Sequence, residues 1–322
     1  MGETSDYTPS SYWSGHVYEK EKKSYDETAG RSYSEAKKKG KKEKDLVLAS
    51  LTTTSKNPFV FLPDLTGSMS SWPGTLVVKA PYLEHQLKNE YLGEDMEMAF
   101  IGVGDAAADD DYPLQVMPFA KGADIKTNLE KLVIEGGGGG NISESYEIAA
   151  LYLARNVTFP KDAKPIAVFV GDEIPAEDVS KRTAERFSII MQEQCLSTKE
   201  IFQELKTKGW TLFFVRKTPT GNTRNSNENV HSTWVKLVGE DHIAVLDEPE
   251  RIVDTIFGLL ATAKDKAEYF YEEMERRQTL AQQETVYRAL KNVLPDRKRL
   301  PYTVLTNVKG GKKSAPLLTH KK

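Results

Sequence analysis

The 322-residue chain lacks several features that would place it outside the cell or in a membrane. It has a single cysteine, Cys195, so no disulfide can form within the chain. No run of about 18 apolar residues, the length of a transmembrane helix, occurs in it. The first residues also lack the apolar segment of a signal peptide. From these absences we expect a cytoplasmic protein with no membrane partner.

The chain also lacks a strong excess of charge of either sign. It has 44 Lys and Arg residues and 47 Asp and Glu residues, for a net charge of −3. Because nucleic-acid-binding domains usually carry a basic excess, we do not expect nucleic acid as a main partner. Two local stretches, residues 36–44 and 309–322, are basic. Such stretches are usually solvated tails, and contact with nucleic acid or an acidic partner is left open only for them.

Composition divides the chain into four segments. Residues 1–45 are rich in Ser, Tyr, Lys and Glu, and they have too few aliphatic side chains to offset the entropy of ordering, so we expect disorder. Residues 46–264 carry most of the apolar runs and form the main domain. Residues 265–295 keep apolar side chains at helical spacing and predict one charged helix. Residues 296–322 are a basic, irregular tail.

Six short apolar runs in the main domain are typical of strands that are buried on both faces. They lie at residues 59–64, 96–105, 114–120, 165–175, 210–217 and 241–246. Segments with helical periodicity separate most of them. This alternation predicts an α/β fold with a doubly wound, mostly parallel six-stranded sheet and helices on both faces. The acidic turn between the second and third runs indicates a hairpin, and therefore one antiparallel edge strand.

Two of these strands end on an aspartate, Asp64 and Asp172. The carboxyl ends of parallel strands meet at one edge of a sheet, so both carboxylates are expected in one crevice. No Lys or Arg lies near either acid in the local sequence, and an unpaired carboxylate there is costly. Thr66 and Ser68 alternate with Asp64 along a turn that Gly67 allows to curl. Because carboxylate and hydroxyl oxygens suit hard cations, the pattern favours a divalent metal site.

The segment FVFLPDLTGSMSSW, residues 59–72, resembles the first strand and the D-x-S/T-x-S metal motif of von Willebrand factor A-type (vWA) domains. The segment VFVGDEIP, residues 168–175, resembles the later strand of these domains that ends on the second metal-site aspartate. The order of elements over residues 55–264 is similar as well. The resemblance implies a Rossmann-like vWA fold with a metal-ion-dependent adhesion site, in which the ligands would include Asp64, Thr66, Ser68 and Asp172.

The glycine-rich loop departs from the vWA pattern. Many members place a threonine ligand in this loop, but GGGNISE puts Ile142 at that position, and isoleucine cannot bind a metal. Asn141, Ser143 or Glu144 would have to supply the oxygen instead. The five glycines of residues 136–140 either form a flexible loop tip or let the backbone approach the ion and its ligand closely.

The resemblance implies a binding protein rather than an enzyme. The ion would be Mg²⁺, or else Mn²⁺ or Ca²⁺, with one open coordination position that an acidic side chain of a protein partner completes. Members of the family inside cells commonly serve as adaptor or assembly subunits. We therefore expect a cation-dependent protein-binding module that acts through the metal-capped edge of its sheet.

Other interpretations of the same residues remain open. The turn after Asp64 could be an Asx-turn followed by helix-capping hydroxyls, which needs no metal. The chain could then be a structural component with a vestigial metal site. It could also be a phosphohydrolase of the haloacid dehalogenase type, with Asp64 as nucleophile and Asp172 on Mg²⁺. Against this, Thr66 stands where the general acid is expected, and no convincing phosphate-binding lysine lies between the two motifs.

Overall fold

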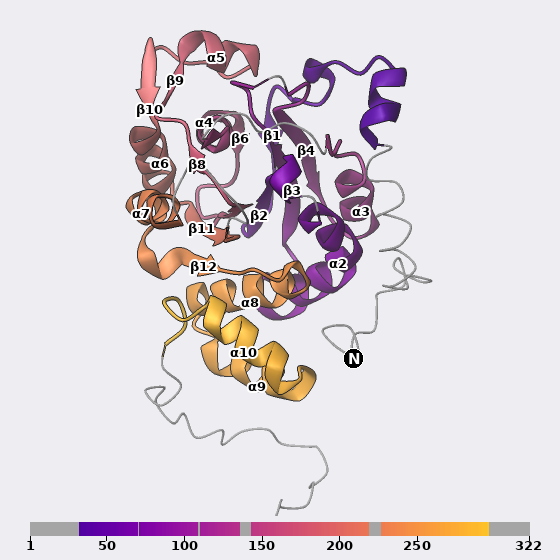
Figure 1. The fold of residues 1–322 in the computed structure, drawn as a ribbon, viewed down its shortest axis with the longest axis vertical. Helices are drawn as coiled ribbons and strands as arrows, with labels where there is room; N and C mark the ends of the chain where they lie inside the picture. The colour runs from indigo at the N-terminus through magenta and orange to yellow at the C-terminus, as the bar shows by residue number, and fades with distance from the viewer. Residues whose placement is uncertain (1–31, 70, 109, 136–142, 219–226, 296–322) are drawn as a thin grey trace, which may run out of the picture.

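A six-stranded sheet organises the computed structural model, which describes residues 32–69, 71–108, 110–135, 143–218 and 227–295 (Figure 1). The strand order is β12-β11-β7-β2-β3-β4. Neighbouring strands are parallel except for the pair of β3 and β4 at one edge. The predicted sheet, with one antiparallel edge strand, is therefore confirmed. The strands are β2 Pro58–Pro63, β3 Glu97–Val103, β4 Leu114–Ala120, β7 Ile166–Gly171, β11 Thr211–Arg216 and β12 Ile243–Val245.

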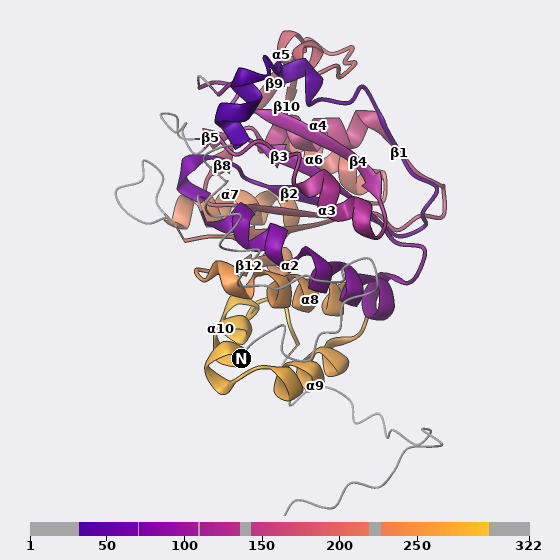
Figure 2. The same ribbon diagram turned by 90° about the vertical axis from the view of Figure 1, so that its right-hand side faces the viewer.

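Helices cover both faces of this sheet, which explains why its strands are continuous apolar runs (Figure 2). Phe59 and Phe61 of β2 enter one hydrophobic core, and Val60 and Leu62 enter the other. The first core is closed by α2 Trp72–Gln86, α3 Ala123–Leu129 and α8 Ile252–Ala263. The second is closed by α4 Tyr146–Asn156, α6 Thr198–Thr207 and α7 Asn227–Val238.

In the part of the chain that the structure describes, three small two-stranded sheets accompany the main one. Strand β1 Leu51–Thr52 pairs in parallel with β6 Val157–Thr158, and β5 Ser143–Glu144 pairs in parallel with β8 Ile174–Pro175. Strand β9 Asp178–Ser180 pairs antiparallel with β10 Cys195–Ser197, and α5 Lys181–Arg186 follows β9 directly. The β5–β8 pair matters most for the site, because it lies beside the segment that carries Asp172.

The segment expected to form one charged helix, residues 265–295, instead contains two helices, α9 Ala267–Arg277 and α10 Leu280–Ala289. The chain becomes extended at Thr279, whose hydroxyl accepts a hydrogen bond from the backbone N–H of Gln282 and caps α10. Apolar side chains of both helices join the first core beneath α8 (Figure 1). A capping threonine within the helical pattern therefore divides the segment.

Residues 32–45, placed by composition in a disordered segment, are folded onto the main domain. Residues 32–38 are helical, and a 3₁₀ turn follows at Glu43–Asp45. Ala36 is buried, the hydroxyl of Tyr112 donates to the carbonyl of Lys41 at 2.9 Å, and Lys37 pairs with Asp111 at 2.7 Å. One buried apolar side chain and a few polar contacts thus hold this polar segment against the main domain. The remainder of the predicted segment, residues 1–31, and the tail from residue 296 lie outside the described residues.

Within the described ranges, the helices are too short or too polar for any of them to cross a lipid bilayer.

Candidate metal-binding site

The loop after β2 places Asp64 at the carboxyl edge of the sheet. The N–H of Asp64 donates to the carbonyl of Val170 in β7, at 3.0 Å, and the N–H of Leu65 donates to the carbonyl of Val103 in β3, at 2.8 Å. The next residues, Gly67–Met69, form a 3₁₀ turn before α2 begins. The loop is therefore held by strands on both of its sides.

Asp64 is fully buried and held by three hydrogen bonds. Its Oδ1 accepts from the N–H of Thr66 at 2.8 Å and from the hydroxyl of Thr66 at 2.6 Å, and its Oδ2 accepts from the hydroxyl of Tyr146 at 2.7 Å. Burial, with the negative charge of Asp172, raises the pKa of Asp64 to about 7, while the donors from Thr66 and Tyr146 oppose that rise.

Ser68 joins this loop to Asp172, which lies 104 positions further along the chain. The Ser68 hydroxyl donates to Oδ1 of Asp172 at 2.9 Å and lies 3.2 Å from the hydroxyl oxygen of Thr66. Asp64, Thr66, Ser68 and Asp172 therefore form one continuous polar chain. Ser68 is exposed whereas Asp64 is buried, so the chain runs from the surface to the base of the site.

Tyr146, the first residue of α4, is a site residue that the sequence analysis missed. Its ring packs edge-to-face against Trp234, with 5.3 Å between centroids, and its hydroxyl lies over Gly171. A Cβ atom at position 171 would come within 1.7 Å of that hydroxyl oxygen. The glycine before Asp172 thus makes room for the donor to Asp64. The position of Tyr146 directly after the glycine-rich loop was the feature of the sequence that could have indicated a site residue.

Lys217 is the second residue that was missed, and it changes the electrostatics of the site. Arg216, the last residue of β11, pairs with Gly171, so Lys217 lies beside Asp172. Its Nζ is 3.1 Å from Oδ2 of Asp172, with side-chain exposures of 12% and 5%, and it also donates to the carbonyl of Ser68. No Lys or Arg is close to Asp172 in the sequence, but Lys217 is close to it in the fold. The predicted strand WTLFFVRK, which ends on this lysine, was the feature of the sequence that could have revealed the contact.

The middle loop is only partly described. Asn141, Ile142 and the glycines of residues 136–140 lie outside the described residues, so the prediction for Asn141 stays a prediction. Strand pairing places Ser143 opposite Ile174, two residues after Asp172. Within the described part of the chain, no hydrogen bond links Ser143 to the four residues of the polar chain.

Glu144 is buried close to the two aspartates. Its Oε2 has no hydrogen-bond partner within the described residues. Burial, reinforced by the charges of Asp64, Asp105, Asp110 and Asp172, raises the pKa of Glu144 to about 11. With these neighbours alone Glu144 is neutral at pH 7.

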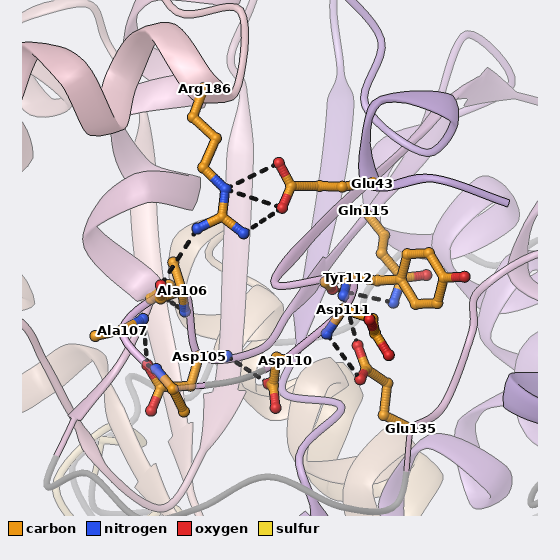
Figure 3. Close-up of polar contacts among 12 residues, drawn as sticks. Glu43, Asp105, Ala106, Ala107, Asp110, Asp111, Tyr112, Gln115, Glu135 and Arg186 are labelled. Atoms are coloured by element: carbon orange, nitrogen blue, oxygen red, sulfur yellow. Dashed lines mark hydrogen bonds and ion pairs between the residues drawn. The ribbon is translucent and has the colours of Figure 1, made fainter. Parts of the chain in front are cut away.

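Asp105 and Asp110, in the loop between β3 and β4, are close enough to Glu144 to raise its pKa. Figure 3 shows the polar contacts of this loop. Oδ1 of Asp105 accepts hydrogen bonds from the N–H groups of Ala107 and Ala108, and Asp110 accepts one from the N–H of Asp105 at 2.7 Å. Arg186 pairs with Glu43 and donates to the carbonyl of Ala106. The N–H of Ala106 in turn donates to the hydroxyl of Ser145, which precedes Tyr146. The folded N-terminal segment, this loop and the start of α4 are thus connected.

The oxygens of the polar chain are of the type that hard cations bind, and two of the distances between them match the spacing of metal ligands. Ligands of Mg²⁺ lie at about 2.0–2.1 Å in an octahedron, so neighbouring ligand oxygens are about 3 Å apart. The distances from Ser68 Oγ to Asp172 Oδ1 and to Thr66 Oγ1, 2.9 and 3.2 Å, fit this spacing. In the described ranges, no three carboxylate, imidazole or thiol groups are arranged to hold a metal. A donor set taken from the polar chain would combine two carboxylates with two hydroxyls.

Comparison with known proteins bears on the fold. No protein-family model matches the chain, and a search of curated proteins found no similar sequence. The open form of the pilus adhesin SpaC from Lactobacillus rhamnosus GG has a TM-score of 0.50 and 11% identity, over 66% of this chain and 30% of SpaC. A second SpaC structure gives 0.48 and 11%, over 66% and 31%. Proximal thread matrix protein 1 from the mussel byssus gives 0.45 and 10%, over 65% and 48%. The chain thus spans less than half of each protein, and the likeness concerns the fold alone.

Proposed function

We propose that this chain is a vWA-type module with a doubly wound sheet, and that it binds a protein partner through a divalent cation held by Asp64, Thr66, Ser68 and Asp172. The observation that carries the proposal is the contact between Ser68 and Asp172, which joins two motifs that are 104 positions apart. A helix cap or an Asx-turn needs only the first of these motifs. A shared ligand accounts for the presence of both.

Charge supports an acidic group on the partner. A divalent cation would balance the negative charges of Asp64 and Asp172. The backbone hydrogen bond from Lys217 to Gly171 holds this residue at the same edge, so its positive charge would remain in excess there after the ion displaces its ammonium group from Asp172. Ser68 is exposed and gives access from solvent. A carboxylate of a partner would offset the excess charge and complete the coordination of the ion.

Thr66 favours binding over phosphoryl transfer. A phosphohydrolase of the haloacid dehalogenase type needs a general acid two residues after its aspartate nucleophile. Thr66 stands at that position, and its hydroxyl donates to Oδ1 of Asp64 at 2.6 Å. We therefore keep the binding module as the proposed function. An adaptor or assembly role in a larger complex follows from the family resemblance alone.

Selection of peptides tests the proposal without knowledge of the natural partner. Random displayed peptides would be selected on the immobilised full chain in Mg²⁺ and released with EDTA. The same selection would use Asp172→Asn, and Asp241→Asn as the control for an exposed aspartate remote from the site. We expect Asp- or Glu-containing peptides from the wild type and the control, and none from Asp172→Asn. Binders that resist EDTA, or that select equally well on Asp172→Asn, would contradict the proposal.

A further inference from the structure

Lys217 occupies the position from which a cation would neutralise Asp172. Its backbone is fixed, because its N–H donates to the carbonyl of Gly171 at 2.8 Å, directly after the β11–β7 pairing. Its ammonium group contacts both halves of the site, through Oδ2 of Asp172 and the carbonyl of Ser68. The side chain is largely buried, with 12% exposed, so this contact is part of the packed structure rather than a loose surface pair.

We propose that Lys217 is a built-in competitor of the divalent cation, which closes the site when no ion is bound. This inference rests on the proposed function and adds its regulation. The ammonium group and a divalent ion would both be attracted to Asp172, and two positive charges within a few ångströms repel each other. Binding of the ion therefore requires Lys217 to release Asp172 and Ser68. The affinity of the site for the ion is lowered by the stability of that contact.

Calorimetric titration of the full chain with MnCl₂ and MgCl₂ measures this competition. Lys217→Met keeps most of the aliphatic stem and removes the charge, Lys217→Arg keeps a charge, and Lys236→Met removes an exposed lysine from α7. We expect Lys217→Met to bind Mn²⁺ at least about tenfold more tightly than the wild type, because it has no competing charge. Lys217→Arg and Lys236→Met should show no such gain. Circular dichroism and melting curves would establish that every variant is folded.

The outcomes separate this inference from the proposed function. If the wild type binds Mn²⁺ and Lys217→Met binds it equally or more weakly, the competitor role is overturned while the cation site stands. If neither protein binds Mn²⁺ or Mg²⁺, the cation site fails and the competitor role fails with it.

The ammonium group can also be observed directly. A buried, paired lysine ammonium gives a slowly exchanging ¹⁵N–¹H NMR signal, which Lys217→Met would assign by its loss. We expect Mg²⁺ to shift or abolish this signal in the wild type as the group is released to solvent. An unchanged signal under conditions in which calorimetry shows the site to be filled would overturn the proposal.

Discussion

The hydrogen bond from Tyr146 to Asp64 gives a quantitative test of how the site is built. Tyr146→Phe removes only the hydroxyl that donates to Oδ2 of Asp64 at 2.7 Å, and it keeps the ring against Trp234. A hydrogen bond to a charged group contributes about 1.5–3 kcal/mol. Tyr152→Phe is the matched control, because this buried tyrosine of the same helix donates at 2.6 Å to the neutral carbonyl of Leu48. Its loss should cost about 0.5–1.5 kcal/mol.

Urea unfolding at pH 8 and at pH 5.5 measures both variants. At pH 8, above the raised pKa of Asp64 of about 7, the carboxylate is charged, and Tyr146→Phe should cost about 1–2 kcal/mol more than Tyr152→Phe. At pH 5.5 Asp64 is protonated, so the difference should shrink, while the cost of Tyr152→Phe stays constant. Equal costs at pH 8, or a difference independent of pH, would refute the view that Tyr146 holds a buried carboxylate.

Three further substitutions test other parts of the structure. Gly171→Ala should lower the free energy of unfolding by about 3 kcal/mol, measured by thermal melting, because the new Cβ would lie 1.7 Å from the Tyr146 hydroxyl oxygen. An unchanged melting temperature would contradict this packing. Burial raises the pKa of Glu147 from 4.5 to about 7. The folded state therefore holds this proton more tightly than the unfolded state, which stabilises the protein below pH 4.5. That contribution to the free energy of unfolding, about 3 kcal/mol, is lost as the pH rises from 4.5 to 7. Glu147→Gln should flatten the dependence of the urea midpoint on pH in that window, and an unchanged slope would count against the burial of Glu147. Leu290→Ala, beside Gly258 of α8, should cost about 2–5 kcal/mol and expose α9 and α10 to limited proteolysis, whereas a wild-type digestion pattern would contradict their docking.

The sheet could be predicted because each of its central strands is buried on both faces. A strand such as β2 places alternate side chains in two different cores, so it appears in the sequence as an uninterrupted apolar run. The same logic predicted that Asp64 and Asp172 lie at one edge of the sheet, since both follow parallel strands. Both inferences need only the distribution of apolar residues along the sequence and the parallel direction of the strands.

The residues that were missed depend on contacts between distant parts of the chain. Lys217 meets Asp172 only because β11 pairs with β7 in a particular register, and no local pattern gives that register. The sequence pattern of Tyr146 is that of an ordinary core residue. Its hydrogen bond to Asp64 depends on the space that Gly171, which has no Cβ, leaves for the tyrosine hydroxyl. The folded residues 32–45 are polar in composition, so few buried side chains and hydrogen bonds decide their order. Composition averages over such isolated contacts.

Diffraction from crystals grown with MnCl₂ would show whether these residues bind a divalent cation, because manganese gives an anomalous signal that locates the ion. We expect a peak between the two halves of the site, bound by Ser68 Oγ and an oxygen of Asp172 and, directly or through water, by Thr66 and Asp64. The Lys217 ammonium group should be displaced from Asp172. Well-diffracting crystals at saturating Mn²⁺ that show no peak there, with Lys217 still paired to Asp172, would contradict the claim that these residues bind a divalent cation.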